Sequence, residues 1–111
     1  MADYATQEKM ERALAYLADT DKPYGQWRAR INALEYQIKV AEAQGYRDNA
    51  DSGTQEYIKS MARTSEAYKN LVNDYAEAEL EYEVIGARRK TAELIIEVFR
   101  TISANQRRGN I

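Results

Sequence analysis

Apolar residues recur along two long stretches of the chain in steps that alternate between three and four residues. This pattern is typical of helices that pack side by side at shallow left-handed angles, and no stretch shows the period of two that a β-strand would give. We call these positions the seam. They are Tyr24, Trp27, Ile31, Leu34, Ile38, Ala41 and Gly45, and then Tyr57, Met61, Thr64, Tyr68, Leu71, Tyr75, Ala78, Tyr82, Ile85, Arg89, Ala92, Ile96, Phe99 and Ser103.

Breaks in the pattern predict where helices begin and end. Asp21 can cap a helix that carries Pro23 in its first turn. A second break covers residues 49–54, where either Ser52 or Thr54 can cap the next helix. We therefore predict helices over about residues 3–18, 23–50 and 54–104, in a single helical domain of residues 1–105 that is followed by a basic tail of residues 106–111.

The predicted helix lengths suggest a topology. A short loop makes the second and third helices antiparallel neighbours, and the second covers a little over half of the third. The first helix can continue the line of the second and cover residues 87–103, or fold back into a compact three-helix bundle. We expect the first arrangement, because the seam persists to the end of the third helix. The predicted fold is all-α: a coiled-coil-like antiparallel hairpin of long helices with a short N-terminal helix.

The C-terminal part of the third helix carries more apolar side chains than one neighbouring helix can cover, because they occupy over half of its circumference. A helix of this kind requires further neighbours. We therefore expect a homo-oligomeric bundle, most simply a dimer; the alternative is a monomer in which the first helix folds over this surface. The predicted oligomer interface is Leu94, Ile95, Val98, Phe99 and Ile102.

Composition excludes many functions. The chain has 111 residues, no Cys and no His, so it lacks thiolate nucleophiles, the usual zinc ligands and the commonest general base. We expect no enzyme activity, no cofactor and no small-molecule substrate. The sequence shows neither a secretory signal nor an apolar run near the ~20 residues of a membrane span, so we expect a protein of the cytoplasm that does not enter a membrane.

Four glutamates, Glu77, Glu79, Glu81 and Glu83, form an acidic series in the third helix. Steps of two place neighbours on opposite sides of a helix, although Glu79 and Glu83 share a face. Carboxylate metal sites in bundles normally add histidines, which this chain lacks. We therefore interpret the series as a solvated face.

The nine tyrosines outnumber the one phenylalanine, and Tyr68, Tyr75 and Tyr82 recur every seven residues. Such rings could stack on single-stranded bases, but no basic residues alternate with them. We favour a seam in which the rings pack between helices and the hydroxyl groups reach water, as suits a thin bundle.

Charge is distributed unevenly over the chain. The net charge is −2, yet residues 84–111 hold six basic residues against two acidic ones. Arg89 falls on the seam, where it can turn outward and pair with Glu93 four residues on. The alternative interpretation is that the basic residues contact phosphates or another partner. The candidate contacts are Arg88, Lys90, Arg100, Arg107 and Arg108.

Residues 85–100 and 104–111, together with Ser65–Tyr68 and Leu34–Lys39, resemble small uncharacterised helical proteins of tailed bacteriophages and prophages. Such proteins often lie among early genes for recombination, replication or host takeover. The resemblance implies an accessory protein of DNA metabolism, acting in the host cytoplasm. It also implies that certain polar residues belong to a recurring feature of the family: Arg88, Lys90, Arg100, Asn105, Arg107, Arg108 and Asn110.

Three functions remain open. In the first, a non-enzymatic phage accessory protein forms a helical oligomer and contacts nucleic acid, or a host or phage DNA-processing protein, through its basic C-terminal end. In the second, the acidic helical surface inhibits or adapts a host protein. In the third, the chain is a coiled-coil assembly factor.

Overall fold

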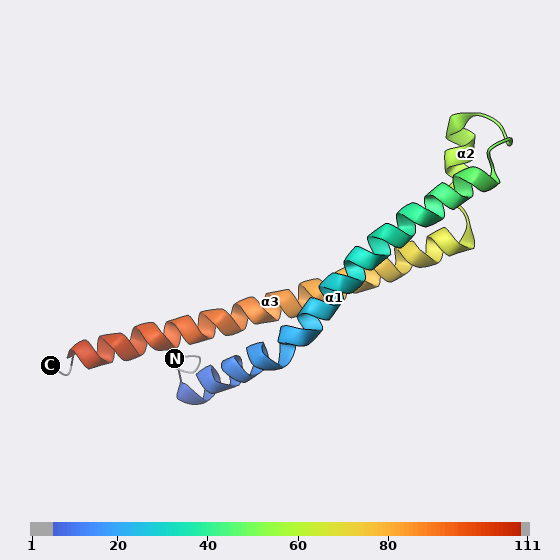
Figure 1. Cartoon of the computed structure of the whole chain (residues 1–111). Helices are drawn as coiled ribbons and strands as arrows, with labels where there is room; N and C mark the ends of the chain where they lie inside the picture. Colours follow the sequence, from blue (N-terminus) through green and yellow to red (C-terminus); the bar gives the residue numbers. More distant parts are fainter. Residues whose placement is uncertain (1–5, 110–111) are drawn as a thin grey trace. The chain divides into compact units, whose positions relative to one another are not determined.

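The computed structural model describes residues 6–109, which form three helices and no strand. They are α1 (Gln7–Asp48), α2 (Gln55–Ala62) and α3 (Glu66–Gly109), shown in Figure 1. The all-α prediction is therefore confirmed. None of the described helices has the length and apolar character that crossing a membrane requires.

The predicted break around Pro23 is wrong, because α1 continues through this proline as one helix of 42 residues. A proline inside a helix removes the hydrogen bond to the carbonyl group four residues earlier, here that of Asp19. The packed side of α1 nevertheless continues past Pro23, since Leu17 before it and Tyr24 after it are both partly buried. The predicted start at residue 3 lies outside the described residues; within them, the hydroxyl of Thr6 accepts the backbone N–H of Lys9 at 3.2 Å.

The predicted third helix is also divided. Thr54, not Ser52, caps α2 by accepting the backbone N–H of Tyr57 at 3.2 Å. The helix ends at Ala62, and α3 begins after a short turn in which the Ser65 hydroxyl accepts the N–H of Tyr68 at 3.2 Å.

This turn shifts the apolar face of α2 by one position from the predicted seam. Ile58 and Ala62 are buried, whereas the seam residues Tyr57 and Met61 are 49% and 38% exposed. From Tyr68 to Ser103, by contrast, every predicted seam residue of α3 is buried or partly buried, and the same holds from Tyr24 to Gly45 in α1.

The chain divides into two compact units. The central unit is Gln26–Tyr82, and the terminal unit comprises residues 1–25 and 83–111. From the sequence alone, we predict a single helical domain of residues 1–105.

In the central unit, α1 and α3 run antiparallel, so that Trp27 and Tyr82 share a core with Leu34 and Ala78. Leu34 is fully buried. α2 packs on α1 where Gly45 meets Ala62, and the guanidinium of Arg63 donates to Glu42 at 2.9 Å. That hydrogen bond holds the pKa of Arg63 above its ordinary value.

In the terminal unit, Ala13 of α1 packs with Ala92 and Ile96 of α3, and Met10 and Leu17 contact the same cluster. The N-terminal part of α1 therefore covers the C-terminal part of α3, as we expect for the first predicted helix. α3 continues to Gly109, beyond its predicted end at residue 104, so most of the predicted tail is helical. Asn110 and Ile111 lie outside the described residues.

Candidate nucleic-acid interface

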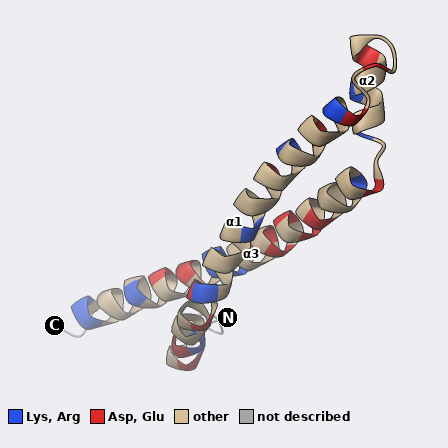
Figure 2. Cartoon of the chain, turned by 45° about the vertical axis from the view of Figure 1, so that its right-hand side comes forward, with Lys and Arg blue, Asp and Glu red and all other residues tan. Residues whose placement is uncertain are grey.

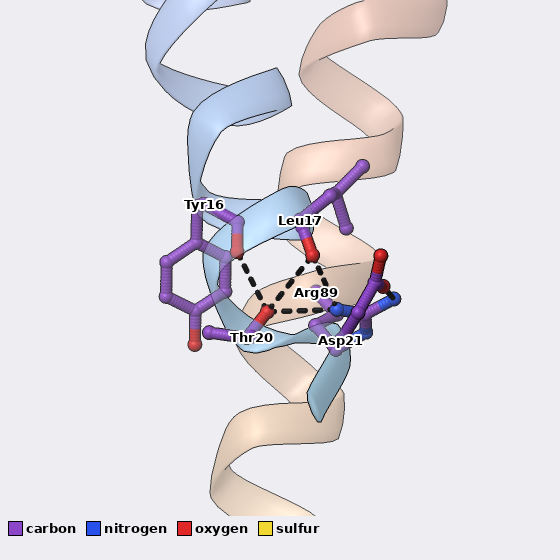
Figure 3. Close-up of polar contacts among 5 residues, drawn as sticks. All are labelled: Tyr16, Leu17, Thr20, Asp21 and Arg89. Atoms are coloured by element: carbon purple, nitrogen blue, oxygen red, sulfur yellow. Dashed lines mark hydrogen bonds and ion pairs between the residues drawn. The ribbon is translucent and has the colours of Figure 1, made fainter. Parts of the chain in front are cut away.

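Arg89 of α3 makes polar contacts with three residues of α1 in the terminal unit (Figure 3). Its guanidinium donates to the main-chain carbonyl of Leu17 at 2.9 Å, to the hydroxyl of Thr20 at 2.7 Å and to the carboxylate of Asp21 at 2.7 Å. Thr20 donates in turn to the carbonyl of Tyr16 at 2.6 Å. The side chain of Arg89 is only 18% exposed, so the charge is partly buried and satisfied within the chain.

The expectation that Arg89 turns outward to pair with Glu93 is therefore wrong. Its partner is Asp21, a residue of the antiparallel helix 68 positions away in sequence. Asp21 does not cap a helix, since it lies inside α1. Arg89 is used to join α1 and α3, and it is not among the candidate phosphate contacts.

The aromatic ring of Tyr24 lies beside the same guanidinium, with the Arg89 Cζ atom 5.2 Å from the ring centroid. The backbone at Gly86 lies close to this ring, because a β-carbon at Gly86 would be 3.1 Å from the Tyr24 hydroxyl oxygen. Glycine at this position thus provides room for the tyrosine.

The five candidate contacts are all exposed, but the helix does not gather them on one face. Arg100 and Arg107 are seven residues apart and therefore share a side of α3, with Arg108 on an adjoining side. Arg88 and Lys90 lie on opposite flanks of Arg89. Figure 2 shows basic residues toward the C-terminal end of α3. From residue 98 to residue 109 this end carries three arginines and no acidic residue.

Arg100 also lies beside a shallow groove in the terminal unit. The groove encloses about 330 Å³ between α1 and α3, and it is lined by Leu14, Leu17, Glu93, Ile96, Glu97 and Arg100. Two carboxylates thus face the same groove as Arg100. The last two arginines, Arg107 and Arg108, have no such acidic neighbours in α3.

The predicted oligomer interface is split between two sides of α3. Leu94, Val98 and Ile102 are 61%, 39% and 37% exposed. Ile95 packs against the Ala13 cluster, and Phe99 is also partly buried. Only the first three residues therefore remain available to a partner.

The three tyrosines that recur every seven residues, Tyr68, Tyr75 and Tyr82, are partly buried in the seam, as we expect. Tyr75 donates to the carboxylate of Glu35 at 3.0 Å, and the hydroxyl of Tyr82 accepts a hydrogen bond from Arg28 at 2.9 Å. The hydrogen bond to Glu35 and partial burial raise the pKa of Tyr75 to about 12. The rings pack between helices while their hydroxyl groups pair at the edge.

A groove in the central unit was not predicted from the sequence. It encloses about 490 Å³ between α1 and α3 and is lined by Trp27, Arg30, Asp74, Glu77, Ala78, Leu80 and Glu81. Arg30 lies 3.9 Å from Asp74, in a weak ion pair across the groove. The sequence signal was available, since Asp74, Glu77 and Glu81 follow 3-4 spacing on one side of α3.

The acidic series thus contributes Glu77 and Glu81 to a groove, not only to a solvated face. Among residues 6–109, no three acidic side chains are grouped in a way that could hold a metal ion.

Compared with known proteins, the chain matches no protein-family model, no curated protein and no solved structure.

Proposed function

We propose that this chain is a non-enzymatic protein that binds nucleic acid through the basic end of α3, formed by Arg100, Arg107 and Arg108. The observation that supports this proposal is the contrast with Arg89. The guanidinium of Arg89 pairs with groups of its own chain, whereas within residues 6–109 the side chains of these three exposed arginines form no hydrogen bond and no ion pair. Exposed cations of this kind can displace the counterions of a phosphate backbone.

The difference in charge between the two units also favours nucleic-acid binding at the basic end of α3. The described part of the terminal unit holds nine basic and seven acidic residues, whereas the central unit holds seven basic and ten acidic residues. A polyanion would therefore be attracted to the terminal unit and repelled by the central one.

The test measures binding of a fluorescent oligonucleotide to the full chain as a function of salt. We expect affinity to fall steeply as salt rises, and the variant R107A/R108A to reduce the slope of log affinity against log salt by about 2. The matched control is K39A/K69A, which removes two exposed cations from the central unit.

Arginines near a helix C-terminus also stabilise the helix through its dipole, so helicity of both variants is compared by circular dichroism. If the natural chain does not bind at low salt, or if the control pair weakens binding as much as R107A/R108A, the proposal is wrong.

The biological setting of the proposal is the one that the phage resemblance implies. We propose an accessory protein of DNA metabolism that acts as a homo-oligomer in the host cytoplasm. If the basic end contacts a DNA-processing enzyme instead, a host protein would be recovered from lysate by the natural chain after nuclease treatment, and would be lost with R107A/R108A.

The groove around Trp27 favours a second candidate function, in which the acidic surface binds a basic protein segment. Three carboxylates and an aromatic ring can together hold lysine or arginine side chains. Trp27 is the chain's one tryptophan, so its fluorescence reports on this groove directly. We expect a lysine-rich peptide to change that fluorescence in the natural chain and to do so more weakly with E77Q/E81Q. No change in either chain would exclude this candidate.

A further inference from the structure

The side of α3 that faces away from α1 carries an exposed apolar stripe in the terminal unit. Helical periodicity places its residues within about 80° of arc, about 130° around the helix from the seam. Leu94 is 61% exposed, Val98 39%, and Val84 and Ile102 37%. The far-side stripe is Val84, Ala87, Thr91, Leu94, Val98 and Ile102.

Thr91 is the one polar residue of the stripe, and its side chain can be buried without losing a hydrogen bond. The hydroxyl of Thr91 donates to the carbonyl oxygen of Ala87 at 3.2 Å, within its own helix. Its donor is therefore satisfied, and its methyl group is left to face a neighbour. A partner that covers the stripe would therefore leave no side-chain hydrogen-bond donor of the stripe without an acceptor.

We propose that a second copy of this chain covers the far-side stripe, with the two α3 segments antiparallel and related by a two-fold axis near Ala92 and Glu93. In this register Ala87 of one copy faces Val98 of the other, and Thr91 faces Leu94. Each layer thus pairs a smaller side chain with a larger one, which keeps the spacing between helices even. A parallel pairing would stack Ala87 on Ala87 and Leu94 on Leu94, alternating narrow and wide layers.

Charge complementarity supports the same orientation. Lys90 and Glu97 flank one edge of the stripe, both exposed, and neither forms an ion pair among the described residues. The antiparallel register brings Lys90 of each copy opposite Glu97 of the second copy, so two new ion pairs form. The interface residues are self-complementary, as a two-fold dimer requires.

The dimer leaves Arg100 and Arg107 accessible, because they lie about 180° around α3 from the stripe. Arg108 lies on the same side of α3 as Lys90, at the edge of the stripe, about five helical turns further along. This inference specifies the homo-oligomer of the proposed function. Its failure would still leave nucleic-acid binding by the monomer untouched, since the two tests use different variants and different readouts.

Because the chain has no cysteine, cross-linking can measure the orientation directly. The probes are Ala87→Cys and Val98→Cys, both at exposed positions. In the antiparallel dimer, two chains carrying A87C hold their cysteines about 16 Å apart along the helix axis. That separation is too great for a disulfide, which needs Cα atoms within about 7 Å. Mixed A87C and V98C chains face each other and should cross-link.

We expect a disulfide-linked dimer in the mixture and almost none with A87C alone, under mild oxidation at low protein concentration. Cross-linking of A87C alone would show a parallel pair and overturn the proposed register. Absence of cross-linking in the mixture would overturn the interface itself.

Sedimentation equilibrium of chains without added cysteine provides a second readout. Each single variant, K90E or E97K, should weaken dimerisation by about tenfold through like-charge contacts. The double variant K90E/E97K restores opposite charges across the interface and should recover most of the affinity. K39E is the matched control in the central unit and should leave dimerisation unchanged. A natural chain that sediments as a monomer, or a double variant weaker than both singles, would contradict the proposal.

Discussion

The guanidinium of Arg89 donates to the backbone carbonyl of Leu17 at 2.9 Å, reaching from α3 into the main chain of α1 about a turn and a half before Pro23. A seam position is ordinarily apolar, and a charge there is stable only when its donors are satisfied. The carbonyl of Leu17, the hydroxyl of Thr20 and the carboxylate of Asp21 provide that satisfaction. Arg89 thereby sets the register of α1 on α3 near the proline.

Substitution of Arg89 should therefore lower the free energy of unfolding by more than substitution of its charged partner, Asp21. We expect Arg89→Ala to lower the free energy of unfolding by about 2 kcal/mol, because charge-assisted bonds are lost at a poorly exposed site. Asp21→Asn should cost under about 1 kcal/mol, since Asp21 is 69% exposed. Arg89→Lys should recover only part of the lost stability, because one ammonium group cannot reproduce the hydrogen bonds that the planar guanidinium donates to several acceptors. Urea denaturation measures all three.

The control for this series is Arg12→Ala, which breaks the exposed pair of Arg12 and Glu8 at 3.1 Å. That pair lies on the surface of one helix and should contribute little. If Arg12→Ala and Arg89→Ala destabilise the chain equally, the role assigned to Arg89 is incorrect.

Gly45 allows the close approach of α1 and α2. A β-carbon there would lie 2.7 Å from the Cα atom of Ala62, so the backbone would have to move. We expect Gly45→Ala to destabilise the chain by about 1–3 kcal/mol, even though alanine favours helix formation by about 1 kcal/mol over glycine. Thermal and urea unfolding measure the change.

Gly25 is the matched control, because it lies in the same helix with nothing within 4 Å of an added β-carbon. Gly25→Ala should stabilise the chain by up to about 1 kcal/mol. The opposite sign of the two substitutions is the expected result; the same sign at both would argue against the close contact.

The phenol of Tyr75 makes stability depend on alkaline pH. Its pKa is raised from 10.0 to about 12, first of all because the protonated hydroxyl donates to Glu35. A group whose pKa is raised on folding contributes stability that is present below its unfolded pKa and is lost as pH rises toward the folded pKa. Stability linked to Tyr75 should thus disappear between about pH 10 and pH 12.

The measurement compares unfolding of the natural chain and Tyr75→Phe from about pH 9 to pH 12. The difference between them should shrink as pH rises, and comparing the two chains cancels the titration of other groups. Tyr36→Phe is the control, because Tyr36 is 69% exposed and should show no such trend. A difference that stays constant across this range would contradict the assigned hydrogen bond.

Leu34 is the one large side chain among the described residues that is fully buried. We expect Leu34→Ala to cost about 2–3 kcal/mol, through lost burial and the cavity left between α1 and α3. Leu80→Ala, at a side chain that is 61% exposed, should cost under about 0.5 kcal/mol. Urea denaturation of the two variants separates core packing from surface effects.

The periodic pattern predicted the packed faces of the long helices well. All seam positions from Tyr24 to Gly45 and from Tyr68 to Ser103 are buried or partly buried. The prediction failed for Tyr57, Met61 and Thr64. Ile58 and Ala62 are the buried residues of α2, and Thr64 is exposed in the turn between α2 and α3. Only weak turn residues mark that position in the sequence.

The candidate site was less predictable than the helices. The composition of the basic end predicts that its arginines are exposed. That Arg89 is paired within the chain instead depends on Thr20 and Asp21, which belong to another helix. The Trp27 groove likewise needs side chains from both α1 and α3.

Sequence by itself determined that this chain is helical and which face of each long helix is packed, because helix propensity and 3-4 spacing act between residues that are close along the chain. Tertiary structure alone decided that α1 passes through Pro23, that Arg89 is paired with Asp21, and that Leu94, Val98 and Ile102 remain uncovered. Those outcomes depend on which distant residues meet, and the free energy of such contacts can outweigh a local signal such as proline.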